Sequence, residues 1–356
     1  MRKLTNFMKQ QSKQFASVVK HPYFGFILFG LILLFTLYLR SMGLVTISII
    51  NAIVMTMIYS IIALGFSLLL GYGGMASLGT AGFVGLGSFI MGYFSGVLHY
   101  PLIYTLGISF GVAIVVGLIV GFISLRIEGM YLAIITLGLG EILRAFFISY
   151  DKFTGGYSGR QFRNFTLFGN AVSAQAVYII ITVLFVLAMI ATLNIIKSPT
   201  GRALLAMKNS DSAAQSMGIS LLKYRLLAFV ISTVFAILAG MLYIMYIKFS
   251  YAPDWNLSFS LNILAAVIVG GAQSIAGIIL GVFTIFGLNL AILNYIPFFQ
   301  NNSALMVIFN GVLIIVVVMF YPGGLIRLLQ TLKYKFVLFI KKLRIKWKVY
   351  KYGKDD

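Results

Sequence analysis

Residues 24–39 read FGFILFGLILLFTLYL, and no charged side chain interrupts them. Apolar stretches of roughly 20 residues, the length at which a helix crosses a bilayer, recur along most of the chain. The 356 residues are 61% hydrophobic and only 10% charged, whereas a soluble domain carries about 25% charged residues. The apolar runs are continuous rather than alternating, which excludes a transmembrane β-barrel. The sequence therefore predicts an all-α polytopic membrane protein.

About ten transmembrane helices are predicted. They lie at about residues 24–39, 44–70, 75–98, 102–125, 129–150, 176–196, 224–248, 258–272, 274–293 and 304–322. The first is interpreted as an uncleaved span, because the basic region before it is too long for a signal peptide. The resulting transmembrane domain, residues 24–322, is flanked by a basic N-terminal segment, residues 1–23, and a basic tail, residues 323–356. Glycine-rich breaks leave open whether residues 71–89 and 258–293 are full spans or re-entrant segments.

The basic residues predict the orientation of the chain. If both termini are cytoplasmic, 21 of the 27 Lys and Arg residues fall on the cytoplasmic side. This is the asymmetry of the positive-inside rule, and it explains the net charge of +20 without nucleic-acid binding. It also places the polar stretch at residues 197–223 in the cytoplasm. The basic tail is interpreted as an anchor on the anionic inner leaflet.

Few side chains could carry catalytic chemistry. The chain has seven acidic residues, two histidines and no cysteine, without metal-ligand spacing, a catalytic triad or a nucleotide-binding motif. The sequence therefore disfavours an enzyme and predicts no metal site or bound cofactor. Near the middle of one predicted span, Glu141 and Arg144 lie on the same helix face. We interpret them as a structural ion pair, and a role in substrate passage is the alternative.

Glycines at helix-packing spacing are frequent. The pairs with small-xxx-small spacing, which allows close helix approach in lipid, are Gly92/Gly96, Gly107/Gly111, Gly117/Gly121 and Gly277/Gly281. The pattern G-G-x-x-S occurs twice, and paired glycine interruptions in two halves of a chain can mark a transport pathway. Helix packing is the simpler explanation. The candidate residues for either role are Gly73, Gly74, Ser77, Thr80, Gly270, Gly271 and Ser274, together with Glu141 and Arg144.

The polar stretch TGRALLAMKNSDSAAQSMGIS, residues 200–220, is too long and too regular for a simple connector. Ser198 and Pro199 predict the start of one short helix, and Asn209 to Asp211 offer the cap of a second. Gly218 is expected to end the second helix with a positive φ. Ala213, Ala214 and Met217 would give that helix a small apolar patch. We therefore predict two short helices and a docking surface on the cytoplasmic face.

Part of this stretch, SAAQSMG at residues 212–218, resembles the E-A-A-x-x-x-G loop of ABC-importer permeases, although Ser212 replaces the glutamate. Further motifs resemble the LivM family of branched-chain amino acid permeases, and their order along the chain matches. They are GYGGMASLGTAGFVGLGSF at 71–89, EGMYLAIITLGLGEILR at 128–144, TGGYSG at 154–159, VIVGGAQSIAGIILG at 267–281 and YPGGL at 321–325. The family often has a histidine at the position of Thr80. The resemblance covers roughly residues 40–330.

This resemblance implies a type II ABC importer-like permease in the cell membrane, most simply for branched-chain amino acids. It implies a second, LivH-like permease, two cytoplasmic ABC ATPase subunits and an extracytoplasmic substrate-binding protein as partners. ATP and Mg²⁺ would then be bound by the ATPase subunits and not by this chain. The ATPase-coupling residues would be Arg202, Asp211, Ala213, Ala214 and Gly218. A stand-alone secondary transporter, or an ABC permease for urea, amides or other small solutes, remains the alternative.

Overall fold

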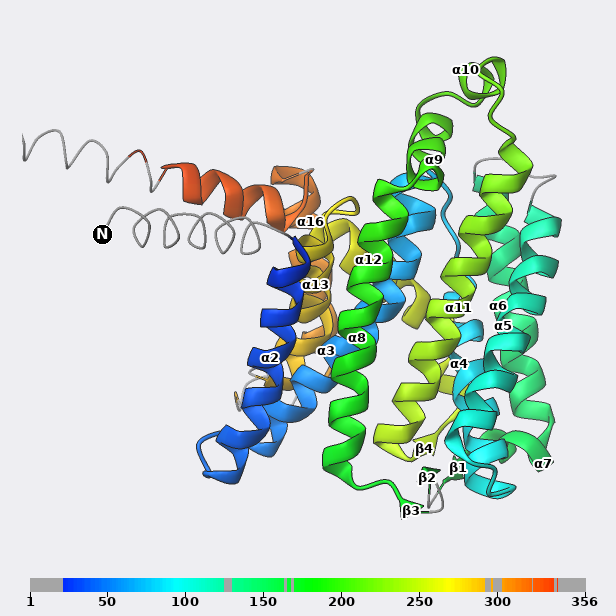
Figure 1. The fold of residues 1–356 in the computed structure, drawn as a ribbon, viewed down its shortest axis with the longest axis vertical. Coiled ribbons are helices and arrows are strands. Elements are labelled where there is room, and N and C mark those ends of the chain that lie inside the picture. Colours follow the sequence, from blue (N-terminus) through cyan, green and yellow to red (C-terminus); the bar gives the residue numbers. More distant parts are fainter. Residues whose placement is uncertain are drawn as a thin grey trace, which may run out of the picture.

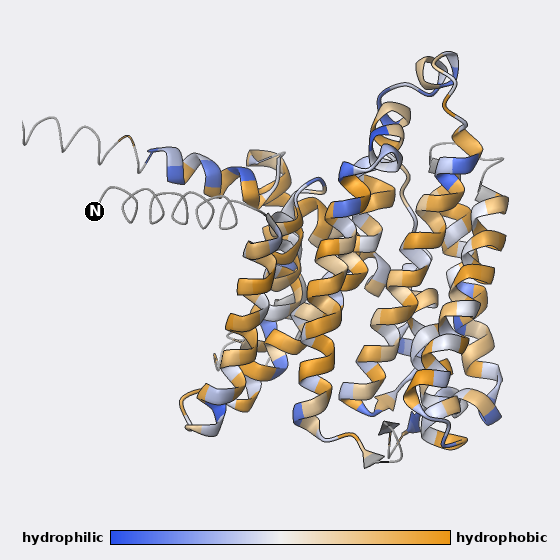
Figure 2. Cartoon of the chain, in the orientation of Figure 1, coloured by the Kyte–Doolittle hydropathy of each residue, from blue (hydrophilic) through white to orange (hydrophobic). Residues whose placement is uncertain are grey.

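The computed structural model describes residues 22–124, 130–162, 165–167, 170–291, 296, 303–321, 323–335 and 338. Most of the two predicted basic segments, residues 1–23 and 323–356, lies outside the described residues. The described part is a bundle of long helices (Figure 1). Its helices are apolar along their length, and hydrophilic residues gather near the two ends of the bundle (Figure 2). This distribution is the one expected of a chain whose middle lies in lipid.

Each of the ten predicted segments coincides with a helix, in several cases extended by a π-helical turn. The elements are α2 (Pro22–Ser41), α3 (Ile47–Ser67) with η1 (Leu68–Tyr72), α4 (Thr80–Met91) with η2 (Gly92–Val97), α5 (Leu102–Ser124), α6 (Met130–Ser149), α8 (Ala174–Lys197), α11 (Leu221–Ile247), α12 (Leu257–Gly270), α13 (Ile275–Val282) with η5 (Phe283–Gly287) and α14 (Leu288–Ala291), and α16 (Ser303–Phe320).

Seven of the described helices are long and apolar enough to cross a membrane. An eighth span results if α16 and the helix Leu325–Lys335, which are bent relative to each other, count as one. The two remaining segments, Leu257–Gly270 and Ile275–Ala291, are shorter apolar helices. The membrane-protein class is thus confirmed, whereas the predicted count of about ten full spans is not.

The centre of the bundle consists of α3, α4 and α11, whose apolar windows are 83%, 72% and 67% buried. By contrast, α2, α5 and α6 are only 6%, 28% and 22% buried and lie at the periphery. The outer faces of these peripheral helices carry large apolar side chains such as Ile32, Phe110 and Ile142. Such faces are suited to contact with lipid or with another membrane subunit.

The break before α4 is buried, non-helical backbone. The predicted segment begins at residue 75, whereas α4 itself begins at Thr80. The amide of Leu78 donates to Thr136 Oγ1 at 2.9 Å, and the amide of Ala81 donates to Ser260 Oγ at 3.0 Å. A Cβ on Gly79 would lie 2.3 Å from the Thr136 carbonyl oxygen, so only glycine fits there. Irregular backbone inside the bundle is therefore covered by protein, as such backbone requires at membrane depth.

The second glycine-rich break connects α12 and α13, which form a hairpin of two short helices. Gly271, in the turn, has a φ of 107°. The two helices approach so closely that a Cβ on Gly270 would lie 2.2 Å from the Gly277 carbonyl oxygen. The described part of the predicted segments, residues 258–291, is therefore broken and is not one continuous helix.

Three of the four predicted glycine pairs pack against other elements. Gly117 and Gly121 contact α11, whereas Gly92 and Gly96 contact the ring of Phe162. The exception is Gly107/Gly111 on α5, where an added Cβ would meet nothing within 4 Å. These two glycines lie on the peripheral face of α5, so close packing of this pair against another helix stays a prediction.

Short elements lie at the two ends of the bundle. One end carries α9 (Pro199–Asn209) and α10 (Asp211–Ser216), and we call it the α9 end (Figure 1). The opposite end carries the 3-10 turns η3 and η4 and two small antiparallel sheets. Their bounds are α7 (Asp151–Thr154), η3 (Gly156–Ser158), η4 (Ala252–Asp254), β1 (Arg160–Gln161) paired with β4 (Phe249–Ser250), and β2 (Thr166–Leu167) paired with β3 (Asn170–Ala171). The motif TGGYSG forms part of this end, and its glycines 155, 156 and 159 all have positive φ values.

The first and last described helices both approach the α9 end. Tyr23, at the start of α2, hydrogen-bonds to Asn194 in the last turn of α8, next to α9. The helix Leu325–Lys335 lies at the same end (Figure 1). This arrangement agrees with termini on one side of the membrane, and their cytoplasmic location stays a prediction.

Candidate functional site

The polar stretch at the α9 end folds as the two short helices that its sequence predicts. Ser210 caps α10 by accepting a hydrogen bond from the Ala213 amide at 3.3 Å. Gly218 follows α10 with a φ of 79°, as expected of a glycine that ends a helix. Ser198 stands at the N-cap of α9, but its side chain makes no cap hydrogen bond, and its hydroxyl instead donates to the Ile195 carbonyl of the preceding helix.

One of the three residues predicted to form the docking patch is buried. Ala214 is only 3% exposed, since α10 packs with this side against α9 and α11. Ala213 is exposed, and Met217 is 83% exposed. The surface that α10 offers to a partner therefore consists of Ala213 and Met217, which we call the α10 patch. The assignment of Ala214 to that surface is wrong, because a helix of less than two turns still has an inner face.

An ion pair within the chain fixes the position of α10. Arg225, near the start of α11, donates from Nη2 to Asp211 Oδ2. The Arg225 side chain is only 13% exposed, and that of Asp211 is 38% exposed. Asp211 is thus engaged inside the chain, whereas Arg202 on α9 is exposed. Of the two charged residues predicted for coupling, Arg202 is the one that faces outward.

Beneath α9, the two glycine-rich breaks meet. The carbonyl oxygen of Gly71 accepts hydrogen bonds from Lys208 Nζ at 2.8 Å and from Gln273 Nε2 at 3.1 Å. The Tyr72 hydroxyl donates in return to the Gln273 carbonyl at 2.9 Å. A Cβ on Gly71 would lie 2.1 Å from the Ala272 carbonyl oxygen, so the two loops are in direct contact. Three segments that are distant in sequence are therefore joined at one carbonyl group.

An open pocket of about 600 Å³ lies beside this contact. It is lined by Leu70, Gly74, Lys208, Ile268, Gly271, Ala272, Gln273, Ser274, Gly323 and Ile326. Of the predicted pathway residues, the structure therefore brings together Gly74, Gly271 and Ser274. Gly73 and Gly270 pack against neighbouring backbone instead, and Ser77 and Thr80 are buried before and at the start of α4.

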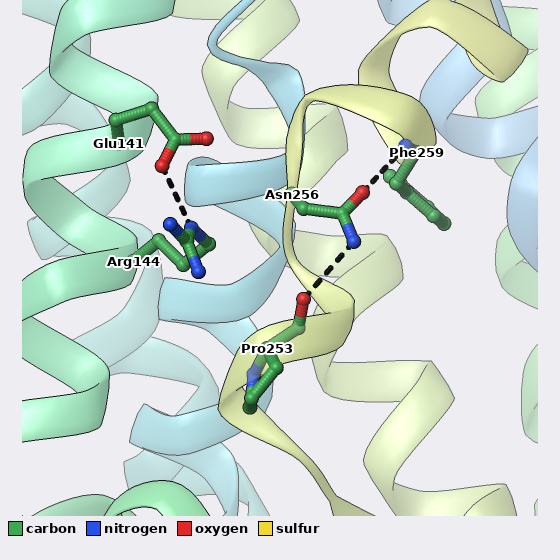
Figure 3. Close-up of polar contacts among 5 residues, drawn as sticks. All are labelled: Glu141, Arg144, Pro253, Asn256 and Phe259. Atoms are coloured by element: carbon green, nitrogen blue, oxygen red, sulfur yellow. Dashed lines mark hydrogen bonds and ion pairs between the residues drawn. The ribbon is translucent and has the colours of Figure 1, made fainter.

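Glu141 and Arg144 form the predicted ion pair on α6. Arg144 Nε donates to Glu141 Oε2 at 2.7 Å. Both side chains project from α6 toward the segment 253–259 at the start of α12, where Asn256 accepts from the Phe259 amide (Figure 3). The side chains of Arg144 and Glu141 are 32% and 38% exposed. The pair is thus accessible from outside the chain and is not enclosed in its core.

A narrow crevice lies next to this pair. It is lined by Leu78, Ala81, Leu137, Gly140, Glu141, Trp255, Asn256, Leu257 and Ser260. The first turns of α4 and α12 therefore both lie beside α6, and α12 begins three residues after η4, which lies at the end of the bundle opposite α9. The described residues contain no group of three His, Asp or Glu side chains that could hold a metal ion.

The sequence did not single out several residues that organise these sites. Four side chains form hydrogen bonds with backbone groups of the glycine-rich segments. They belong to Lys208, Gln273, Tyr72 and Thr136. Their signal in the sequence is weak, because each is one polar residue in or near an apolar run. Only their long-range partners reveal what they do.

Comparison with known proteins places these features in a family. The family model described as "Branched-chain amino acid transport system / permease component" matches residues 48–318. The chain is 31% identical over 257 residues to the high-affinity branched-chain amino acid transport system permease protein LivM of Escherichia coli strain K12. It is 30% identical over 254 residues to the protein of the same name from Salmonella typhimurium strain LT2. Each alignment covers 64% of this chain and 59% of the relative. No solved structure matches the chain significantly.

Proposed function

Since this chain belongs to the family of branched-chain amino acid transport permeases, we propose that it is the membrane-spanning subunit of an ATP-driven importer. The proposed substrates are branched-chain, hydrophobic amino acids. The observation that carries the proposal is the family match over residues 48–318, which includes the polar stretch with α9 and α10. The alignments span about three fifths of the length of the two relatives, 59% in each case.

The proposed partners are a second, LivH-like permease, two ATPase subunits and an extracytoplasmic substrate-binding protein. The ATPase subunits would bind ATP and Mg²⁺ and dock on the α10 patch and on Arg202, which are exposed at the α9 end. The α9 end would then be cytoplasmic. Movement of α9 would reach the glycine-rich breaks through the hydrogen bond between Lys208 and Gly71. Because both breaks are parts of discontinuous helices, they are suited to change shape between inward-open and outward-open states.

The test is uptake by the complete complex in proteoliposomes. The chain is co-expressed with a second permease, the ATPase subunits and the binding protein encoded by neighbouring genes. We expect ATP-dependent uptake of labelled leucine that unlabelled isoleucine and valine inhibit. Uptake by the chain alone, driven by an ion gradient, would instead establish a secondary carrier. Uptake of urea or short amides without uptake of leucine would overturn the proposed substrate class.

A further inference from the structure

The Glu141–Arg144 pair uses only part of its hydrogen-bonding capacity. Among the described residues, its one polar contact joins Arg144 Nε to Glu141 Oε2. The two terminal nitrogens of Arg144 therefore have no hydrogen-bond partner among the described residues. They form a planar fork that matches a carboxylate. Oε1 of Glu141 likewise has no partner there and can accept a hydrogen bond from an ammonium group. A pair with a purely structural role is more often satisfied by several protein partners.

The depth of the pair adds a second observation. Glu141 lies eleven residues into a helix of 20 residues, which places it roughly 17 Å along a helix of about 30 Å. A charged group at such depth costs roughly 2.5–3.5 kcal/mol on insertion scales, and more on other measures, when lipid surrounds it. Both side chains are nevertheless about one third exposed on the chain surface. A polar surface opposite this face of α6, such as a water-filled path, would lower that cost.

Two polar residues lie among the mostly apolar residues next to Glu141. Asn256 and Ser260 line the crevice next to Glu141, at the first turn of α12. The Ala81 and Phe259 amides of these two first turns are bonded to Ser260 Oγ and Asn256 Oδ1, so only the dipoles of α4 and α12 favour an anionic group beside them. Discontinuous helices whose first turns lie within the membrane are a recurring setting for solute recognition in transporters.

We propose that Glu141 and Arg144 bind the zwitterionic head group of an amino acid as it passes along this face of α6. The carboxylate of the substrate would contact the Arg144 fork, and its ammonium group would contact Glu141. Such a site recognises the carboxylate and ammonium groups that all α-amino acids share. Selectivity for the substrate side chain is therefore determined elsewhere. The inference rests on the proposed function, because it assumes that the permease transports amino acids.

The test uses the complete complex and separates this role from a structural one. Arg144→Lys keeps the ion pair but removes the fork, and Glu141→Gln removes the acceptor charge. Arg40→Gln, a loss of one charge on the exposed end of α2, is the matched control. Yield of assembled complex, ATP hydrolysis stimulated by the binding protein, and uptake of labelled leucine are measured for each variant.

We expect normal yield and ATP hydrolysis in both pair variants, with leucine uptake at a fixed concentration reduced about tenfold to a hundredfold, the scale of one charge-assisted hydrogen bond. Arg40→Gln should leave uptake unchanged. In the wild-type complex of permeases and ATPase subunits without the binding protein, leucine should also raise the melting temperature, whereas isoamylamine and 4-methyl-2-oxopentanoate, which each lack one charge, should not.

Three outcomes would overturn the inference. The first outcome is that both variants take up leucine at the wild-type level. The pair would then not be part of the pathway, and the proposed function would stand. In the second, yield falls in each variant and the double variant Glu141→Gln/Arg144→Gln restores both yield and uptake, which establishes a structural pair. In the third, the wild-type complex transports urea or amides but no amino acid, so the proposed function fails together with the inference.

Discussion

The amine of Lys208 donates a hydrogen bond to the carbonyl oxygen of Gly71 at 2.8 Å, although 137 residues separate the two in sequence. Lys208 belongs to α9, on the outer surface of the α9 end. Gly71 belongs to η1, directly before the break that precedes α4, and its carbonyl also binds Gln273 in the second break. This contact is thus a direct mechanical connection from a surface helix to both discontinuous segments. A movement of α9 would have to stretch it or carry the breaks along.

Removing the amine should weaken this connection. Lys208→Met keeps most of the side-chain volume but deletes the donor. Because the bond is partly exposed, its loss should weaken the interaction of α9 with Gly71 by about 1 kcal/mol. This corresponds to a roughly fivefold decrease in the amount of leucine transported per ATP hydrolysed. The measurement is the ratio of leucine transported to ATP hydrolysed in proteoliposomes. Lys197→Met, at an exposed lysine in the last turn of α8, is the control, and an equal effect in both variants would contradict the prediction.

The contact between the two breaks should not tolerate a methyl group. A Cβ on Gly71 would lie 2.1 Å from the Ala272 carbonyl oxygen, whereas a Cβ on Gly107 would meet nothing within 4 Å. We expect Gly71→Ala to lower the stability of the purified permease by about 1–3 kcal/mol. Gly107→Ala should be neutral or stabilising by up to about 1 kcal/mol. Thermal unfolding in detergent compares the two, and a tolerated Gly71→Ala would mean that the loops are not in contact.

The irregular backbone before α4 should depend on one hydroxyl group. Thr136 Oγ1 accepts from the Leu78 amide, while Thr192 Oγ1 bonds only within its own helix, to the Ala188 carbonyl. Both threonines are fully buried. Thr136→Val should therefore cost about 1–3 kcal/mol, because a part-buried amide loses its acceptor, whereas Thr192→Val should cost much less. Equal melting temperatures for the two variants would show that another group satisfies Leu78.

Local features of this fold were predictable from the sequence, and contacts between distant segments were not. Hydropathy located all ten apolar helices, because burial in lipid acts on each segment separately. The cap at Ser210 and the positive φ at Gly218 followed from local backbone chemistry. By contrast, the lengths of α12 and α13 and the start of α4 at Thr80 depend on tertiary packing. The inward orientation of Ala214 likewise depends on α9 and α11, which no local pattern contains.

The α10 patch gives the final prediction, which concerns docking of the ATPase subunits. Met217 is 83% exposed and lies in no membrane-spanning helix, so Met217→Asp should leave the fold intact. It should nevertheless reduce the amount of ATPase that co-purifies with the permease by about tenfold, since it places a charge in an apolar contact. Ala214→Asp, three residues away, should instead lower the melting temperature of the permease alone, because Ala214 is only 3% exposed. If Met217→Asp still binds the ATPase normally, the patch is solvent-facing in the complex, and docking must use another surface of the α9 end.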